Sequence, residues 1–225
     1  METNRSGFLI AATGAVALAA TTAGADAAGT YDRTAMNAIL NRPGRHRLII
    51  GAPRLNGVAP MRSAAHIMGA YQFAFGEGPG TTNVVVSLYG PTSILCVMND
   101  AFWANYHAYE LSQALGDMPA QILNQKRNPY LHARSSMNPH DQPEDDQGFY
   151  HDYTVEAMLR RHVAWFVCNE ALHTASHELS QLGDGTPEAC YAALRAHIIP
   201  GPIVVPSGSQ ALVVAQELHF TYQAA

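Results

Sequence analysis

The sequence has few charged residues and almost no lysine. Charged side chains make up 14% of the 225 residues, and 13 basic residues face 18 acidic ones for a net charge of −5. This balance excludes a basic nucleic-acid-binding protein, and a hydrophobic content of 48% excludes a disordered acidic chain. Among the basic residues only Lys126 is a lysine. The chain therefore offers almost no candidate for Schiff-base or phosphate-binding lysine chemistry.

The motifs of several large enzyme classes are also missing. The chain has no GxxxxGK[ST] phosphate loop, no strand-linked GxGxxG and no GxSxG elbow. Phosphate-loop hydrolysis, the usual dinucleotide-binding fold and standard serine-hydrolase chemistry therefore lose support. Cys96, Cys168 and Cys190 form no CxxC pair, and no His/Cys spacing is typical of a structural zinc site. Because the cysteine count is odd, at least one thiol is outside any internal disulfide, while a disulfide between the other two stays open.

The first 27 residues have the pattern of an export signal. An apolar run at 8–20 follows a short leader with Arg5 and precedes the small-x-small cleavage signature ADA at 25–27. The run is shorter than the ~20 residues that span a bilayer; the alternative is a buried N-terminal helix. The leader NRSGFL is similar to a twin-arginine signal in which asparagine replaces the first arginine. We expect residues 28–225 to form one periplasmic or secreted domain without a membrane span, exported by the Sec or a degenerate twin-arginine route.

Short apolar runs alternate with segments of helical periodicity in the rest of the chain. The predicted strands are 47–52, 83–89, 163–167 and 203–205, with an edge strand near 220–222. The predicted helices are 61–75, 94–115, 170–182, 188–198 and 209–218. Strands that are apolar on both faces and alternate with helices predict an α/β fold, with a mainly parallel sheet covered on both sides.

Residues 116–152 interrupt this alternation with a long irregular insertion. They contain four prolines, an acidic run at 144–146 and polar tracts. A connection this long inside a domain is usually a binding loop, a lid, an arm that contacts a partner or a disordered segment. Disorder or simple packing and a functional arm both stay open.

The residues that follow each predicted strand are the candidate ligand-binding residues, because ligands of open α/β sheets bind at the carboxyl ends of the strands. They are Arg54, Asn56 and Gly57; Gly90, Thr92 and Ser93; Cys168 and Asn169; and Ser207, Gly208 and Ser209. We expect these four groups to meet at one edge of the sheet. A small ligand is expected to contact Asn56, Thr92, Ser93, Ser207 and Gly208.

Cys168 stands where a buried strand is predicted to end and a helix to begin. Asn169 is expected to cap that helix, and a helix N terminus favours a thiolate, the reactive form of cysteine. His173 follows after five residues and could tune the thiol. The competing interpretation is a small buried residue that fills the strand end. Cys168, Asn169 and His173 are thus the candidate catalytic residues.

The remaining cysteines and a histidine pair are weaker candidates. Cys96 is expected on a mixed polar and aromatic helix face that suits an interface or a pocket wall, and Cys190 is expected to fill core or surface. His173 and His177 have i, i+4 spacing, which can chelate a metal or simply belong to a surface helix; no glutamate follows the first histidine as in HExxH. We predict no metal and no cofactor.

Several phrases resemble the DsrE-like family over about residues 47–222. They are FVCNEAL at 166–172, NDAFWANY at 99–106, RNPY at 127–130 and LRAHIIPGPIVVPSGSQALVVAQELHFTY at 194–222. The resemblance implies a flavodoxin-like three-layer fold and homo-oligomers or complexes with related subunits. In sulfur-relay relatives a cysteine at the end of a central strand carries sulfur as a persulfide, and only Cys168 matches that position. Export and the arm at 116–152 depart from the small cytosolic relay proteins.

Three functions therefore stay open. In the first, an exported sulfur-handling protein uses the Cys168 thiolate to take a sulfane sulfur and pass it to a partner thiol, as a persulfide carrier or sulfurtransferase. In the second, a non-catalytic module binds a small ligand at the sheet edge and packs its NDAFWANY face against another subunit. The third is metal binding through His173 and His177.

Overall fold

A five-stranded sheet of parallel strands lies at the centre of the described part of the protein. The computed structural model describes residues 31, 33–78, 80–117, 126–132 and 153–225, and those from Arg33 to Ala225 group into one compact unit. The predicted export signal at 1–27 and most of the arm at 116–152 lie outside the described residues. Among those it describes, the structure has no helix that is both long and apolar enough to cross a membrane.

The strands follow the order β4-β3-β2-β1-β5, and every neighbouring pair is parallel. Their bounds are β1 His46–Ala52, β2 Thr82–Leu88, β3 Ala164–Cys168, β4 Ile203–Val205 and β5 Thr221–Ala224. The central strands β2 and β3 are buried along almost their whole length, as expected for a parallel sheet covered on both faces. The predicted strands, including the edge strand, are confirmed within one or two residues at each end.

Helix α2 precedes β1, and the other helices lie in the connections between successive strands. Their bounds are α2 Arg33–Leu40, α3 Ala59–Gly69, α4 Asp100–Asn105, α5 Ala108–Ala114, α6 Val155–Arg160, α7 Asn169–Gln181, α8 Pro187–Ala196 and α9 Gly208–Glu217. A π-helical turn, η2 (Ala70–Ala74), extends α3, and a 3-10 turn, η3 (Ser93–Val97), follows β2.

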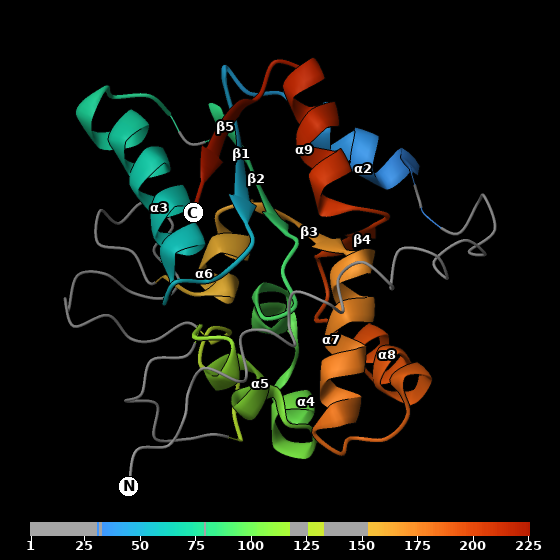
Figure 1. Cartoon of the computed structure of the whole chain (residues 1–225). Helices are drawn as coiled ribbons and strands as arrows, with labels where there is room; N and C mark the ends of the chain where they lie inside the picture. Colours follow the sequence, from blue (N-terminus) through green and yellow to red (C-terminus); the bar gives the residue numbers. More distant parts are fainter. Residues whose placement is uncertain (1–30, 32, 79, 118–125, 133–152) are drawn as a thin grey trace, which may run out of the picture. The chain divides into compact units, whose positions relative to one another are not determined.

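The helices form a layer on each face of the sheet, with α3 on one side and α2 and α9 on the other (Figure 1). One hydrophobic core contains residues from α3 to α8 packed on one sheet face, and the second contains residues of α2 and α9 on the opposite face. The handedness of parallel crossovers explains this division. From β1 to β4 the chain moves one way along the sheet, and from β4 it returns across to β5, so α9 must cover the other face. The fold is therefore a flavodoxin-like three-layer sandwich with its own strand order.

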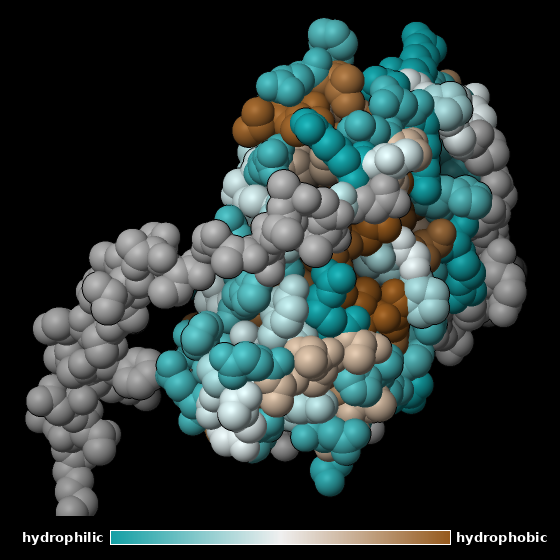
Figure 2. All heavy atoms as spheres, turned by 90° about the vertical axis from the view of Figure 1, so that its right-hand side faces the viewer, coloured by the Kyte–Doolittle hydropathy of each residue, from teal (hydrophilic) through white to brown (hydrophobic). Residues whose placement is uncertain are grey.

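Strand β4, at one edge of the sheet, has two features that protect it from pairing with another chain. Strand β4 is short, and Pro202 and Pro206, which have no N–H to donate, flank it. Figure 2 faces this side of the molecule, where hydrophobic side chains show in a hollow between more polar regions. Proline and short length both discourage an edge strand from pairing with another chain.

The single helix predicted at 94–115 is wrong. The segment breaks into η3, α4 and α5, because Met98 adopts an extended conformation and pairs antiparallel with Ile198. Asn99 then starts α4, accepting a hydrogen bond from the Phe102 N–H. Cys96 consequently lies buried in the 3-10 turn. The prediction that Cys96 lies on a mixed polar and aromatic helix face is wrong as well.

Candidate functional site

The candidate residues after the strands do gather at the carboxyl edge of the sheet, in two separate groups. The first group joins the connections after β1 and β2, and the second joins the ends of β2 and β3 to the start of α9. The two groups differ in chemistry. The first is closed by its own hydrogen bonds, whereas the second contains a thiol.

In the first group, the Asp117 carboxylate holds the loops together. One oxygen accepts the backbone N–H groups of Leu55 and Asn56 at 3.2 and 3.4 Å, and the other accepts the Thr92 hydroxyl. Asp117 is 2% exposed. Thr92 is buried too, so its side chain serves the fold at this point, while Asn56 is exposed. The Asp117 carboxylate thus already occupies the backbone N–H groups after β1 that could otherwise bind an anion.

The loop after β2, the second loop of this group, is also closed by its own hydrogen bonds. The Ser93 hydroxyl bonds to the backbone N–H and the carbonyl of Gly90, both at 3.1 Å. A Cβ at Gly90 would lie 1.7 Å from the carbonyl oxygen of Pro53, so only glycine lets the loops approach this closely. The buried Ser93 therefore shapes a turn between packed loops.

In the second group, Cys168 ends β3 and is itself the N-cap residue of α7. Asn169, which we expected at the cap, is the first helical residue. The Cys168 side chain is 2% exposed. All three cysteines fall in the described residues and carry free thiols. The position at a strand end and a helix start agrees with the sequence prediction for Cys168.

The start of α9 lies directly beside Cys168. A Cβ built on Gly208 would be 3.2 Å from the Cys168 Cβ and 3.1 Å from the Ser87 hydroxyl, and that hydroxyl donates to the Gly208 carbonyl at 3.1 Å. The hydroxyl of Ser207, the N-cap residue of α9, donates a hydrogen bond to Glu170 Oε2 at 3.4 Å. Because α7 leaves on one face of the sheet and α9 on the other, this point between β3 and β4 is a topological switch point.

Tyr89 packs against the same helix start without adding charge. A Cβ on Gly208 would come within 2.5 Å of the Tyr89 Cβ. Burial and a hydrogen bond with Tyr222 raise the pKa of Tyr89 to about 12. Its hydroxyl is therefore neutral at physiological pH.

The predicted residues Asn169 and His173 are joined through Tyr191 of α8. The Tyr191 hydroxyl donates to Asn169 Oδ1 at 2.6 Å, and its ring stacks on His173 with the centroids 4.3 Å apart. Tyr191 was missed because it lies 22 residues from Asn169 and belongs to no motif. His177 is exposed on α7, and the described residues contain no group of three or more metal-ligating side chains that could hold an ion.

The other two cysteines are poor nucleophiles. Burial raises the pKa of Cys96 far above its usual range, with a further contribution from the nearby Asp117 charge. Burial also raises the pKa of Cys190, again with a smaller effect of an aspartate, Asp184. Cys190 is fully buried on α8, in agreement with a filling role. Cys168 is thus the cysteine whose position suits chemistry.

The face formed by NDAFWANY contributes mainly to the core of this chain. Phe102 and Trp103 are buried, and Trp103 Nε1 donates to the Leu95 carbonyl at 3.1 Å. Within the part of α4 that these residues form, Ala101, Ala104 and Asn105 are exposed. The large aromatic side chains are therefore used inside the fold.

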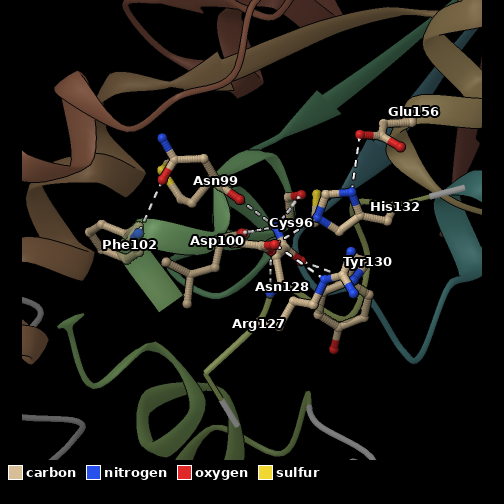
Figure 3. A network of polar contacts seen from close by, with 11 residues as sticks. Cys96, Asn99, Asp100, Phe102, Arg127, Asn128, Tyr130, His132 and Glu156 are labelled. Carbon is tan, nitrogen blue, oxygen red and sulfur yellow. Dashed lines mark hydrogen bonds and ion pairs between the residues drawn. The ribbon is translucent and has the colours of Figure 1, made fainter. Parts of the chain in front are cut away.

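Part of the arm is fastened to the same region. The described arm residues 126–132 place Asn128 against three backbone carbonyls, those of Leu95, Cys96 and Met98, at 3.3, 2.9 and 2.5 Å (Figure 3). The Asn128 side-chain oxygen accepts the Tyr130 N–H at 2.9 Å. This stretch is packed onto the core, in agreement with the interpretation of simple packing for these residues.

Comparisons with family models, curated proteins and solved structures give no match. The chemistry of the site therefore follows from its residues and their geometry.

Proposed function

We propose that this protein handles sulfur through Cys168, which carries a sulfane sulfur as a persulfide, as in DsrE-like sulfur-relay proteins. The observation that supports the proposal is the position of the free Cys168 thiol at the N terminus of α7, with the start of α9 packed against it. Helix N termini stabilise negative charge. The starts of α7 and α9 both lie beside Cys168, a setting that suits a sulfur species with negative charge, such as a persulfide.

The chemistry is an exchange of sulfur–sulfur bonds. The Cys168 thiolate attacks the outer sulfur of a donor persulfide, a new S–S bond forms, and the donor leaves as a thiolate. With thiosulfate as donor, the leaving group is sulfite. An acceptor thiolate then attacks the terminal sulfur, and Cys168 leaves as a thiolate again. Each step forms one S–S bond and breaks another, so no external oxidant or reductant is required.

The surroundings restrict the donors and acceptors. Because Cys168 is 2% exposed, small inorganic or low-molecular-weight sulfur donors fit better than the thiol of a rigid protein surface. Asn169 is held by Tyr191, and Gly208 by Ser87, so neighbouring backbone is fixed around the thiol. We extend the proposal to export through residues 1–27, which puts the sulfur chemistry in the periplasm or outside the cell.

The test is sulfur loading of the purified mature protein. We expect thiosulfate, polysulfide or glutathione persulfide to add one sulfur atom, seen by mass spectrometry on the peptide that contains Cys168. Cys168→Ser should abolish the addition, and Cys190→Ala should retain it, with both variants checked for folding by circular dichroism. Full loading of Cys168→Ser, or no loading of the folded wild-type protein by any of the three donors, overturns the proposal.

A further inference from the structure

Residues 126–132 of the arm form a strap that is fastened at several points to the core. Tyr130 and Leu131 are buried, and their carbonyls accept the backbone N–H groups of Val155 and Glu156 at 2.9 and 3.0 Å. These two residues begin α6, the helix that precedes β3. The strap therefore holds the first turn of α6 in place.

His132 ends the strap between two carboxylates from different helices (Figure 3). Its Nε2 lies 2.9 Å from Asp100 Oδ2, at the start of α4, and its Nδ1 lies 3.2 Å from Glu156 Oε1, at the start of α6. All three side chains are between one third and two fifths exposed, so protons reach them readily. One imidazole ring thus bridges the N-terminal turns of two helices.

The protonation state of His132 decides how many of these contacts are attractive. A protonated imidazole has an N–H on each ring nitrogen and can donate to both carboxylates, whereas a neutral one has a single N–H. When the ring is neutral, a nitrogen lone pair must face one of the two carboxylate oxygens. The bridge is therefore complete only with charged His132, charged Asp100 and charged Glu156.

Other charged groups at the strap favour the ionised Asp100. Partial burial alone would raise the pKa of Asp100, but the Asn128 N–H bond, the His132 bond and charge, and the Arg127 charge lower it below its usual value. The Arg127 Nε lies 3.2 Å from the same Asp100 oxygen that His132 contacts. On α6, Arg160 is four residues from Glu156. Both arginines keep their charge throughout the range in which histidine titrates.

We infer that His132 is a proton-dependent latch, which fastens the strap to α4 and α6 when it is protonated and loosens the start of α6 when it loses its proton. The sign follows from the three groups. A carboxylate with a lowered pKa contributes its stabilisation above its unfolded pKa and loses it on acidification, and a histidine that needs its proton loses its contribution as the pH rises. This inference is independent of Cys168 and goes beyond the proposed function.

Amide hydrogen exchange of the full-length protein tests the latch. The N–H groups of Val155 and Glu156 report on the strap directly, because their acceptors are strap carbonyls. After correction for intrinsic exchange, we expect their protection to fall roughly fivefold between pH 5.5 and pH 8, the loss of one partly exposed ion pair. We expect a second fall in protection at acidic pH, where the carboxylates that face His132 take up protons.

Two variants and one control separate the latch from a general effect of pH. His132→Gln is neutral at every pH and should remove the change between pH 5.5 and pH 8, and Glu156→Gln should reduce it. His107→Gln, which breaks a different histidine–carboxylate pair, should leave it unchanged. The inference is overturned if His132→Gln keeps the wild-type pH dependence, or if the wild-type amides show no pH dependence.

Discussion

Asn128 gives the sharpest test of how the arm is attached to the core. Its amide has two N–H groups, which serve the Cys96 and Met98 carbonyls at 2.9 and 2.5 Å; the Leu95 carbonyl is farther, at 3.3 Å. Its oxygen accepts the Tyr130 N–H at 2.9 Å. Asn128→Ala therefore removes three buried hydrogen bonds at about 1 kcal/mol each, or about 3 kcal/mol in total. A loss of this size is a large part of the ~5–15 kcal/mol that stabilises a typical domain.

Urea unfolding followed by circular dichroism measures this loss directly. We expect a free energy of unfolding lower by about 3 kcal/mol and a melting temperature lower by roughly 6–12 °C. Asn128→Asp should be at least as destabilising, because an acceptor oxygen then faces backbone carbonyls. Asn105→Ala, at an exposed position on α4, is the matched control and should stay within about 0.5 kcal/mol of wild type. If Asn128→Ala also stays within that margin with an unchanged m value, the attachment of the strap through Asn128 is refuted.

Three further predictions concern the sheet edge and the histidine pairs. The Cβ of Gly90→Ala would lie 1.7 Å from the Pro53 carbonyl oxygen, so this variant should yield little folded protein. Gly57→Ala is the control: its Cβ would lie in open space at φ 75°, and it should lower the free energy of unfolding in urea by only about 1–2 kcal/mol. Equal stabilities of the two variants would contradict the loop geometry. Gly208→Ala should push the start of α9 away from Cys168. We expect slower alkylation of the Cys168 thiol by a charged reagent and slower sulfur loading, while circular dichroism shows that the fold persists. Unchanged rates argue against a role for the start of α9. The hydrogen bond with Asp184 raises the pKa of His107, so the pair stabilises the fold fully below about pH 6.5 and loses this effect as the pH rises through the raised pKa. His107→Gln should therefore lower the free energy of unfolding more at pH 6 than at pH 9. The reverse trend would contradict a stabilising ion pair between His107 and Asp184.

The strands were predictable because their signal is local. The segment NVVVSLY contains consecutive β-branched residues and ends at a Gly-Pro turn, and β2 forms there almost as predicted. The helix at 94–115 failed for a tertiary reason. Its apolar residues Ile94, Val97 and Phe102 are all buried, but Cys96 and Trp103, which one continuous helix would place on the opposite face, are buried as well. Pairing of Met98 with Ile198 breaks the helix between Val97 and Phe102.

The candidate site shows the same limit. The position of Cys168 was predicted correctly, because the residues next to it in the sequence indicate both the end of a strand and the start of a helix. The partners that shape the edge are distant in the sequence: Asp117 lies 62 residues from Leu55, and Asn128 lies 32 residues from Cys96. Asp117 belongs to no motif, and the RNPY phrase that contains Asn128 gave no indication of its contacts. Only the folded chain brings these side chains to the loops that they fasten.

The two groups of residues at the carboxyl edge of the sheet differ in the chemistry that they can support. Buried backbone N–H groups must be paired, and after β1 the Asp117 carboxylate already pairs those of Leu55 and Asn56. An external anion there would have to displace a buried carboxylate that also accepts the Thr92 hydroxyl, and both groups would then need new partners. At the β3 end, by contrast, the starts of α7 and α9 lie beside Cys168, whose side chain makes no cap hydrogen bond. Under the proposed function, sulfur exchange at Cys168 is a reaction that leaves the hydrogen bonds of Asp117 in place.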